Sequence, residues 1–186
     1  MSRLNLFRSA LAVSLMVLCT SCAEFEQATL SATEAARNSL YPQRAKGRPK
    51  IVVSLGAQRA YLYKGKTMVG ESTISTGKPG FETPPGSYRV IQKDADHVSS
   101  IYGDYVDRSG RVVKPNVSVR EDRAPKGSRF VGARMPYFLR FTGGYGMHAG
   151  YVPRYRASHG CIRMPTNMAK RFFNTAQLNT PVIVRR

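Results

Sequence analysis

The chain has 186 residues and carries 29 Lys and Arg against 11 Asp and Glu, which gives a net charge of +18. This length suits one domain plus a leader and is enough to bury a core. The charge favours a polyanionic partner, but the basic residues are scattered and form no recognisable nucleic-acid module, so we expect no nucleic-acid partner. Three explanations of the charge remain. The protein binds anionic lipid, it binds an acidic cell-wall polymer, or its surface is generally basic with no dedicated polyanion site.

The N-terminus has the features of an export signal. Arg3 and Arg8 form a basic start, and the run ALAVSLMVL at 10–18 follows them. This run is too short to span a bilayer, which needs about 20 apolar residues. We therefore expect residues 1–21 to be a signal peptide.

The sequence TSC directly after this run resembles a bacterial lipoprotein processing site, although Cys19 stands where that pattern usually has leucine. The expectation is that Cys22 is lipidated and anchors a periplasmic protein to a membrane of the bacterial cell envelope. Ordinary signal cleavage near Ala23 is the alternative. If Cys19 leaves with the signal and Cys22 is acylated, Cys161 is the only thiol of the mature protein and has no disulfide partner, which favours a reactive role.

Residues 22–49 are expected to form a tether. This segment is rich in Ala, Ser, Thr, Gln and Arg, and only 33–40 has the pattern of a turn or two of helix. Pro42, Gly47 and Pro49 interrupt regular structure, so we place the start of the folded domain at residue 50 and its end at 186.

The first part of that domain reads as short strands separated by turns. Strands are expected at 51–53, 60–63 and 68–76, with a hairpin turn at 64–66, and another at 87–93. Short strands without a long helical pattern predict a mainly β fold, a sandwich or a barrel.

Residues 94–126 are polar and rich in Gly, Ser and Tyr, and we expect a long loop over one face of the domain. Tyr102, Tyr105 and Arg108 either line a cleft there or pack the loop onto the sheet. His97, beside two aspartates, is interpreted as a solvated loop histidine rather than a metal ligand.

The C-terminal part predicts a strand, a helix and a strand. The first strand covers 138–141 and leads through three glycines to His148. Thr166 is the expected N-cap of a helix that Pro181 terminates, and 182–184 is the closing strand. The buried face of the helix is expected to contain Met168, Phe172 and Ala176.

Cys161 and His148 are candidates for nucleophilic catalysis. A free thiol is mostly protonated at neutral pH, and a neighbouring imidazole or backbone dipole lowers its pKa to about 3.5–7.5. The backbone N–H groups of the turn from Ser158 to Cys161 are candidates to stabilise an oxyanion, with Gly160 permitting close approach of a substrate. Arg163 adds positive charge or holds a substrate carboxylate.

Each of these residues also has a structural interpretation. The thiol is a small buried hydrophobe, the histidine a satisfied core residue and the arginine a surface charge. A metal site formed by His148, His159 and Cys161 is a third alternative, but no fourth ligand is nearby in the sequence.

The motif SHGCIRM at 158–164, preceded by His148 and Gly150, resembles the signature of the L,D-transpeptidases with a YkuD-type catalytic domain. The likeness includes VSLGAQRAYLYKGKTMV and STGKPGFETPPGSYRV, which resemble the N-terminal strands and the STGK…TPxG turn of that family. It covers residues 50–186.

The resemblance implies a mainly β sandwich with one or two short helices, a long loop over the active-site face, and no cofactor. It implies a peptidoglycan enzyme whose Cys161 forms a thioester with a tetrapeptide stem, usually after meso-diaminopimelate, and releases D-alanine. Transfer to an amine of a second stem gives a 3→3 cross-link, so donor and acceptor stems are the expected partners. His148 would be the general base, oriented by the backbone carbonyl just after it.

The same resemblance places Ser158, His159, Gly160 and Arg163 on the substrate and oxyanion side. His148 is assigned as the base because some members of the family have lysine or serine where His159 stands. Ala149 departs from the glycine that commonly follows the base, with little expected effect because the implied contact is main-chain. The loop 151–157 contains Arg154 and Arg156, which are expected to adjust acceptor preference.

Three alternatives stay open. The same residues would serve an L,D-carboxypeptidase, in which water resolves the thioester, or a transferase that links stems to an envelope protein. A non-catalytic wall-binding module with a vestigial cysteine belongs to a different class. Sortases order His, Cys and Arg in the same way, but their Thr-Leu-x-Thr-Cys signature is absent.

Overall fold

The computed structural model describes residues 28–29, 32–33, 36, 38–42, 44–153 and 155–186. The chain divides into two units, residues 1–40 and 41–186. In the first unit, residues 28–29, 32–33, 36 and 38–39 are helical. The expected signal peptide and Cys22 lie outside the described residues. No helix in the described part of the chain is long and apolar enough to cross a membrane.

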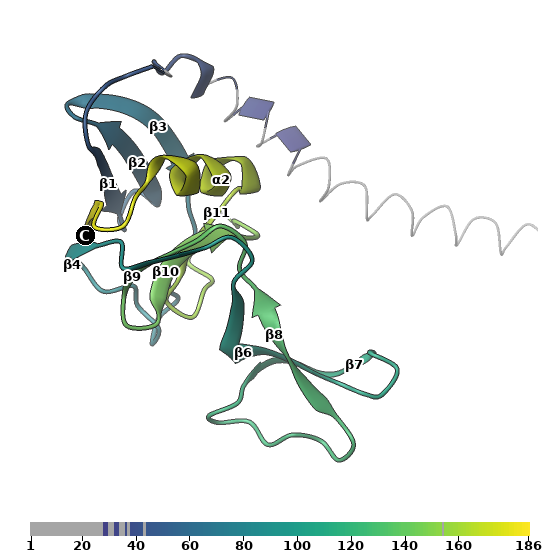
Figure 1. Cartoon of the computed structure of the whole chain (residues 1–186). Coiled ribbons are helices and arrows are strands. Elements are labelled where there is room, and N and C mark those ends of the chain that lie inside the picture. The colour runs from purple at the N-terminus through teal and green to yellow at the C-terminus, as the bar shows by residue number, and fades with distance from the viewer. Residues whose placement is uncertain (1–27, 30–31, 34–35, 37, 43, 154) are drawn as a thin grey trace, which may run out of the picture. The chain divides into compact units, whose positions relative to one another are not determined.

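The second unit begins with one sheet of a sandwich (Figure 1). This sheet has five strands in the order β3-β2-β1-β12-β4. Their bounds are β1 (Pro49–Ser54), β2 (Arg59–Lys64), β3 (Thr67–Thr73), β4 (Gly86–Arg89) and β12 (Pro181–Arg185). The strand β1 pairs in parallel with the C-terminal β12 and antiparallel with β2. The predicted hairpin turn between β2 and β3 is confirmed, and Gly65 adopts a φ of 58° there.

The second sheet has four strands in the order β11-β10-β9-β5. Their bounds are β5 (Gln92–Asp94), β9 (Phe138–Thr142), β10 (Tyr145–Ala149) and β11 (Ile162–Met164). Alternate side chains of these strands enter the hydrophobic core, among them Leu139, Phe141, Met147, Ile162 and Met164. The residues between them face the opposite side. The predicted mainly β sandwich is confirmed, and we call the outward side of this second sheet the catalytic face.

The strand predicted at 87–93 is divided between the two sheets. β4 ends at Arg89, and β5 begins at Gln92. At the crossing, the Val90 N–H donates to the Thr180 carbonyl at 2.9 Å and the Ile91 N–H donates to the Arg140 carbonyl at 2.8 Å. These bonds to different partners allow the chain to change sheets, which its alternating pattern does not reveal.

The helix α2 (Thr166–Thr175) packs Met168, Ala169 and Phe172 into the core. Two expectations about its ends were wrong. Pro165 is the N-cap and Thr166 is already helical, while Ala176 is the extended C-cap, so the helix ends well before Pro181. The ammonium group of Lys93 donates to the Phe173 and Ala176 carbonyls at 2.7 and 2.5 Å, and so satisfies the C-terminal end.

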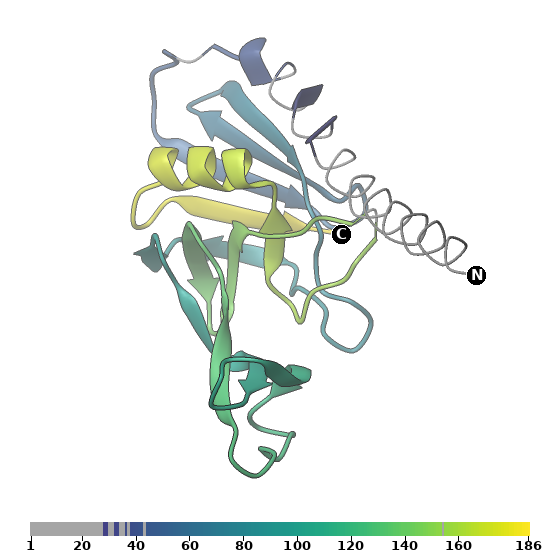
Figure 2. The ribbon, with the colours of Figure 1, turned by 90° about the vertical axis from the view of Figure 1, so that its right-hand side faces the viewer.

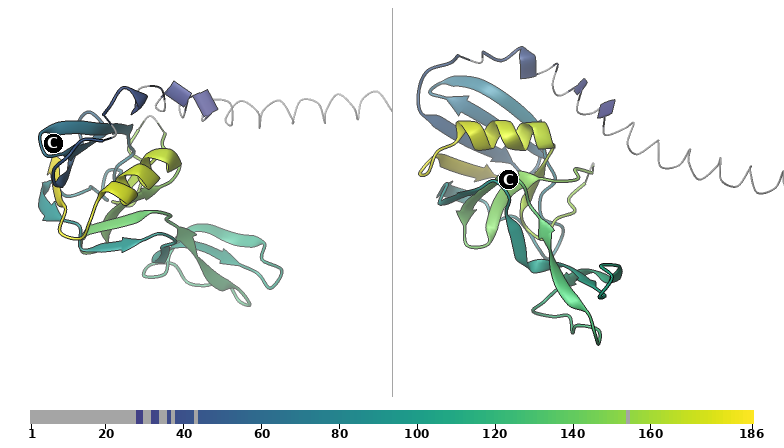
Figure 3. Two further views of the ribbon diagram at one scale, coloured as in Figure 1. Left: turned by 45° about the horizontal axis from the view of Figure 1, so that its top comes forward. Right: turned by 45° about the vertical axis from the view of Figure 1, so that its right-hand side comes forward.

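The segment expected to be a loop is instead largely a sheet. Three strands in the order β7-β6-β8 form it: β6 (Val98–Val106), β7 (Val112–Ser118) and β8 (Arg129–Arg134). We call residues 98–134 the flap, and Figures 2 and 3 show it projecting beyond the sandwich. The pattern was misread because β8, which hydrogen-bonds β6, lies beyond the polar segment in sequence.

A large bulge in β6 is directed at the catalytic face. Val98 pairs with Arg134, whereas the next pair is Gly103 with Gly132, so residues 99–102 stand opposite a single residue of β8. The Ser99 hydroxyl accepts the N–H groups of Ile101 and Tyr102 at 3.2 and 2.9 Å and holds the bulge in shape. Bulges of this kind redirect side chains next to functional sites.

Candidate active site

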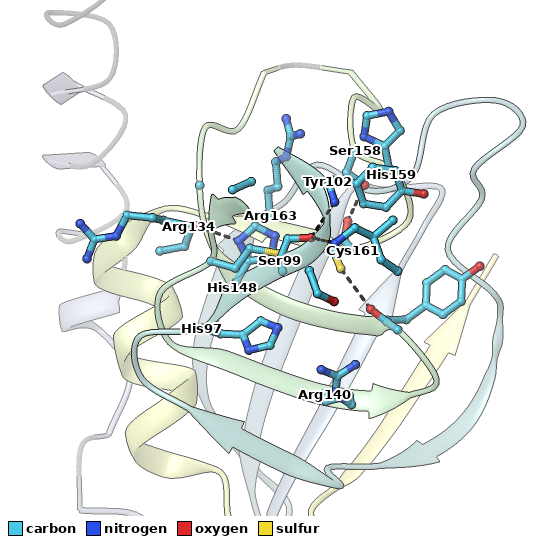
Figure 4. Close-up of a pocket in the computed structure, with 18 of the residues that line it drawn as sticks. His97, Ser99, Tyr102, Arg134, Arg140, His148, Ser158, His159, Cys161 and Arg163 are labelled. Atoms are coloured by element: carbon cyan, nitrogen blue, oxygen red, sulfur yellow. Dashed lines mark hydrogen bonds between the residues drawn. The ribbon is translucent and has the colours of Figure 1, made fainter. Parts of the chain in front are cut away.

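The pairing of β10 with β11 brings the two candidate catalytic residues to one face. The strands are parallel, with His148 opposite Arg163, and Cys161 directly precedes β11. The neighbours of these residues in each strand are buried in the core, so the side chains of His148, Cys161 and Arg163 all lie on the catalytic face. They line one pocket together (Figure 4).

His148 is held as a neutral base. Its side chain is buried, with 6% of the residue exposed, and its Nδ1 lies 2.8 Å from the Ala149 carbonyl. Because a carbonyl only accepts, Nδ1 carries the proton and Nε2 is left as the acceptor. Burial lowers the pKa of His148 to about 4, despite the opposing effect of the Ala149 bond. The carbonyl after this histidine therefore has the position that the resemblance implied, with alanine in place of glycine.

The Cys161 thiol has a backbone carbonyl as its hydrogen-bond partner. Its S–H donates to the Gly144 carbonyl at 3.6 Å (Figure 4). Burial raises the pKa of the thiol, and the Gly146 N–H and the charges of Arg140 and Arg163 oppose that effect only in part. No imidazole is among the groups that lower the pKa of this thiol, because a buried neutral imidazole supplies no charge to stabilise a thiolate.

The turn 158–161 is attached to the STGK segment by backbone hydrogen bonds. Ser75 and Arg163 exchange N–H···O bonds of 3.0 and 2.9 Å. The Ser158 N–H donates to the Thr76 carbonyl at 3.1 Å, and the Lys78 N–H donates to the Ser158 carbonyl at 3.0 Å. The two motifs are therefore parts of one structure.

Thr83 of the TPPG segment forms hydrogen bonds with both of these motifs. Its hydroxyl donates to the Gly160 carbonyl at 2.7 Å and accepts the Gly77 N–H at 3.1 Å. Gly160 has a φ of 112°, and a Cβ there would lie 2.6 Å from Cε1 of Tyr145. Only glycine fits this position without rearrangement. The sequence contained Thr83 in its motif but gave no sign of this role.

The hydrogen bonds of the turn leave only some of its N–H groups for an oxyanion. The Ser158 N–H is used by Thr76, and the Gly160 N–H donates to the Ser158 hydroxyl at 3.1 Å. That hydroxyl in turn donates to the Cys161 carbonyl at 2.5 Å. Within the described chain, the N–H groups of His159 and Cys161 have no such acceptor. Of the four N–H groups expected to stabilise an oxyanion, these two are therefore the ones that remain as donors.

His159 connects the turn to two other segments through its ring. It stacks on Tyr102 of the β6 bulge, with centroids 4.5 Å apart and planes 12° apart. Phe81 meets it edge-on at 4.8 Å. Burial lowers the pKa of His159, and the charges of Lys78 and Arg163 lower it further. Tyr102 was expected either to line a cleft or to pack the loop onto the sheet, and in the structure it lines the pocket.

The pocket over the catalytic face has a volume of about 480 Å³. Its lining has a single sign of charge, because no Asp or Glu is among its described residues while four arginines are. These are Arg120, Arg134, Arg140 and Arg163. In the view of Figure 4, Cys161 lies between Arg163 and Arg140, and the guanidinium groups of Arg163 and Arg134 both point away from the thiol, the first upward and the second to the left.

His97 is also part of this pocket, and its assignment as a solvated loop residue was wrong. Its Nδ1 lies 2.9 Å from Asp94 Oδ2, and its ring stacks on Phe138 at 4.2 Å. The sequence gave no sign of this contact, because Phe138 belongs to a distant strand.

The remaining residues singled out in the sequence lie elsewhere. Tyr105 is buried in the flap, where its hydroxyl donates to the Asp122 carbonyl at 3.0 Å. Arg156 donates to the Leu55 carbonyl at 3.3 Å, Arg108 does not line the pocket, and Arg154 lies outside the described residues. In the described part of the chain, no three His, Cys, Asp or Glu side chains gather as metal ligands.

Comparisons with known proteins identify the family and the fold of the chain. Residues 48–184 match the family model of the YkuD-type L,D-transpeptidase catalytic domain. The structure is similar to that of an L,D-transpeptidase from Mycobacterium smegmatis, with a TM-score of 0.56 and 18% identity over 75% of this chain and 59% of that one. It is also similar to an L,D-transpeptidase from Stackebrandtia nassauensis, with a TM-score of 0.55 and 19% identity over 84% and 66% of the two chains.

A third similar structure is the L,D-transpeptidase LdtMt1 in complex with imipenem, with a TM-score of 0.55 and 19% identity over 74% of this chain and 58% of that one. The chain thus spans about three-fifths of the length of the first solved structures it matches. No curated protein sequence matches it.

Proposed function

We propose that this chain, which belongs to the YkuD-type L,D-transpeptidase catalytic-domain family, forms 3→3 cross-links in peptidoglycan through a thioester on Cys161. The observation that carries the proposal is the parallel register of β10 and β11. This register puts the imidazole of His148 on the same face as the thiol. The Nδ1–H of the imidazole donates to the Ala149 carbonyl. This is the arrangement that a thiol needs when it is protonated at rest and must lose its proton as it attacks.

In the acylation step, Nε2 of His148 takes the thiol proton while Sγ attacks the carbonyl carbon after the third residue of a tetrapeptide stem. The negative charge that develops on the carbonyl oxygen is stabilised by the N–H groups of Cys161 and His159. The imidazolium is stabilised by the Ala149 carbonyl, and it donates its Nε2 proton to the nitrogen of the departing D-alanine. The C–N bond breaks and the thioester remains.

The second step runs through the same groups in reverse. An unprotonated amine of a second stem attacks the thioester, His148 takes a proton from the new nitrogen, and the C–S bond breaks. His148 then returns the proton to the sulfur. With water as the nucleophile, the product is a free tripeptide, which is the carboxypeptidase alternative.

The thiol is expected to react with a strained lactam. One similar structure is an L,D-transpeptidase in complex with imipenem. We expect a carbapenem to acylate Cys161 with loss of no atoms, so the intact mass should increase by the mass of the drug. An unchanged mass under saturating drug would favour the non-catalytic wall-binding alternative, and Cys161→Ala is the matched control.

The test of the proposed function is incubation with purified tetrapeptide muropeptides, followed by mass spectrometry of the products. Cross-linked dimers with release of D-alanine support transpeptidation. Tripeptides alone indicate a carboxypeptidase, and stems joined to an added envelope protein indicate an anchoring transferase. No product from an enzyme that a carbapenem acylates would contradict the proposed substrate.

We also propose that the protein acts at the bacterial cell envelope as a lipoprotein anchored through Cys22. The net charge of +18 supports this location, since wall polymers carry carboxylates and phosphates that would hold a basic enzyme near them. Cys22→Ala should move the protein from the membrane fraction to the soluble fraction. Unchanged partitioning would refute the anchor.

A further inference from the structure

Arg163 is a cation without a protein anion beside it. It lies on β11, lines the pocket and is half-buried. The described chain offers its guanidinium no salt bridge or side-chain hydrogen bond, whereas Arg140 donates to Gln92 Oε1 at 2.6 Å and to the Gly143 carbonyl at 2.9 Å. A partly buried guanidinium remains charged, so leaving it unpaired costs free energy that a bound anion recovers. None of its five N–H donors has an acceptor within the described chain.

Arg163 lies on the same side of the thiol as the base. It is the register partner of His148 across the two parallel strands. A Cβ at Gly150 would lie 3.5 Å from Cε1 of His148 and 3.5 Å from Cγ of Arg163, so the imidazole edge and the arginine stem border the same space. The side of the base is also the side of the nitrogen that leaves in acylation and attacks in transfer, because His148 exchanges a proton with that nitrogen.

We infer that Arg163 binds a carboxylate attached to the same carbon as the leaving or attacking nitrogen, so that the site recognises the free end of an α-amino acid. The inference rests on the proposed function. D-Alanine, the leaving group, has its nitrogen and carboxylate on one carbon. The side-chain end of diaminopimelate has the same arrangement, and a planar guanidinium fork matches a carboxylate in two parallel hydrogen bonds.

This assignment distinguishes between acceptors. A diaminopimelate stem presents an amine with a carboxylate beside it, while the ε-amine of a lysine inside a protein does not. The geometry therefore favours a stem acceptor over a protein lysine. It also predicts that a donor whose terminal D-alanine carboxylate is amidated acylates the enzyme slowly.

The experiment is an exchange assay with the full-length protein and a purified tetrapeptide donor. The acceptors are D-methionine, D-methioninamide and Nα-acetyl-lysine at equal concentration, and mass spectrometry measures each adduct. We expect D-methionine to be used about 10- to 100-fold faster than the other two, the ratio that a charge-assisted hydrogen-bond pair supplies. D-Methioninamide is a stringent comparison. It lacks the carboxylate that raises the pKa of the neighbouring amine, so a larger fraction of its amine is unprotonated and able to attack.

Variants assign the preference to the residue. Arg163→Gln should bring the D-methionine to D-methioninamide ratio towards equality, and Arg163→Lys, which retains the charge but loses the fork, should keep part of it. Arg108→Gln removes the same charge from an exposed residue outside the pocket, and it should keep the wild-type ratio. Circular dichroism and alkylation of Cys161 by uncharged iodoacetamide report whether each variant is folded with an accessible thiol.

Equal use of the acid and the amide by an active wild-type enzyme would overturn the inference and leave the proposed function standing. An unchanged ratio in a folded Arg163→Gln variant would also overturn it. If wild-type protein releases no D-alanine from the donor and forms no acyl-enzyme, the proposed function fails, and the inference fails with it.

Discussion

The catalytic face and the flap are both built from β-strands, but they differ in what lies behind them. The strands β9, β10 and β11 carry the catalytic face on one side and core residues such as Met147 and Ile162 on the other. The flap has a few buried residues of its own and exposes large apolar side chains, among them Val112, Val113 and Val131. The strands that carry the reacting groups are therefore packed against the core of the domain. The flap, which lines part of the pocket, has few buried residues behind it.

This difference separates two kinds of residue. Groups on the catalytic face are positioned by register and by backbone bonds to the STGK segment, so their geometry depends on the stability of the whole domain. The flap meets the catalytic turn mainly through the stack of Tyr102 on His159. Changes in the flap should alter substrate handling with little effect on global unfolding, because contacts with the sandwich core are few.

The largest expected effect comes from the catalytic face itself. His148→Asn should lower transpeptidation and carbapenem acylation by about 10²- to 10⁴-fold, the usual contribution of a general base. His159→Asn is the matched change on the neighbouring turn, and it should cost about tenfold or less because it removes ring stacking only. Single-turnover acylation followed by intact mass measures both. The opposite ranking would contradict the assignment of His148 as the base.

Thr83→Val tests whether the catalytic turn depends on the segment beneath it. The change removes the hydroxyl that donates to the Gly160 carbonyl and accepts from Gly77. We expect a loss of about 1–3 kcal/mol in the free energy of unfolding and a fall in acylation rate, because two buried backbone groups lose their partner. Thr67→Val, at the exposed start of β3, is the control for chemical denaturation and kinetics. Equal stability of the two variants would show that Thr83 does not hold the turn.

Tyr102→Leu breaks the connection between the flap and the turn. The stack is worth about 0.5–1.5 kcal/mol, so transpeptidation should fall by about 2- to 10-fold. Tyr102→Phe keeps the ring and should retain the wild-type rate. Thermal unfolding of the leucine variant should match the wild type. A large loss of stability would mean that flap and sandwich are one cooperative unit.

The smallest effect is expected from mild acid. The pKa of His148 is lowered to about 4, so the imidazole stays neutral at pH 7 and protonates only as the pH falls through about 4. At pH 5, about nine-tenths of it is still the base, and acylation by a carbapenem should be almost unchanged from pH 7. A histidine base with an ordinary pKa would instead lose activity with a midpoint of about 6.5. A pH series of single-turnover rates distinguishes the two.

Much of the sandwich was accessible from local pattern. The β-branched runs and the Lys64–Lys66 turn predict β1 to β3, and the motifs around His148 and Cys161 predict the chemical class. The flap was not accessible, because β6 finds β8 only across a long separation. The division of 87–93 between two sheets was equally hidden, since it depends on Thr180 and Arg140.

The sequence by itself determined which groups are available for the chemistry, namely one thiol in the catalytic domain, two histidines near it and an excess of positive charge. Only the tertiary structure decided how they are used. Burial makes His148 a neutral base and keeps Cys161 protonated, and the register of β10 with β11 places Arg163 beside the base without a protein anion. The physical reason is that the residue types decide which reactive groups are present. The desolvation of those groups and the register of the strands that carry them arise from segments that meet only in the folded chain.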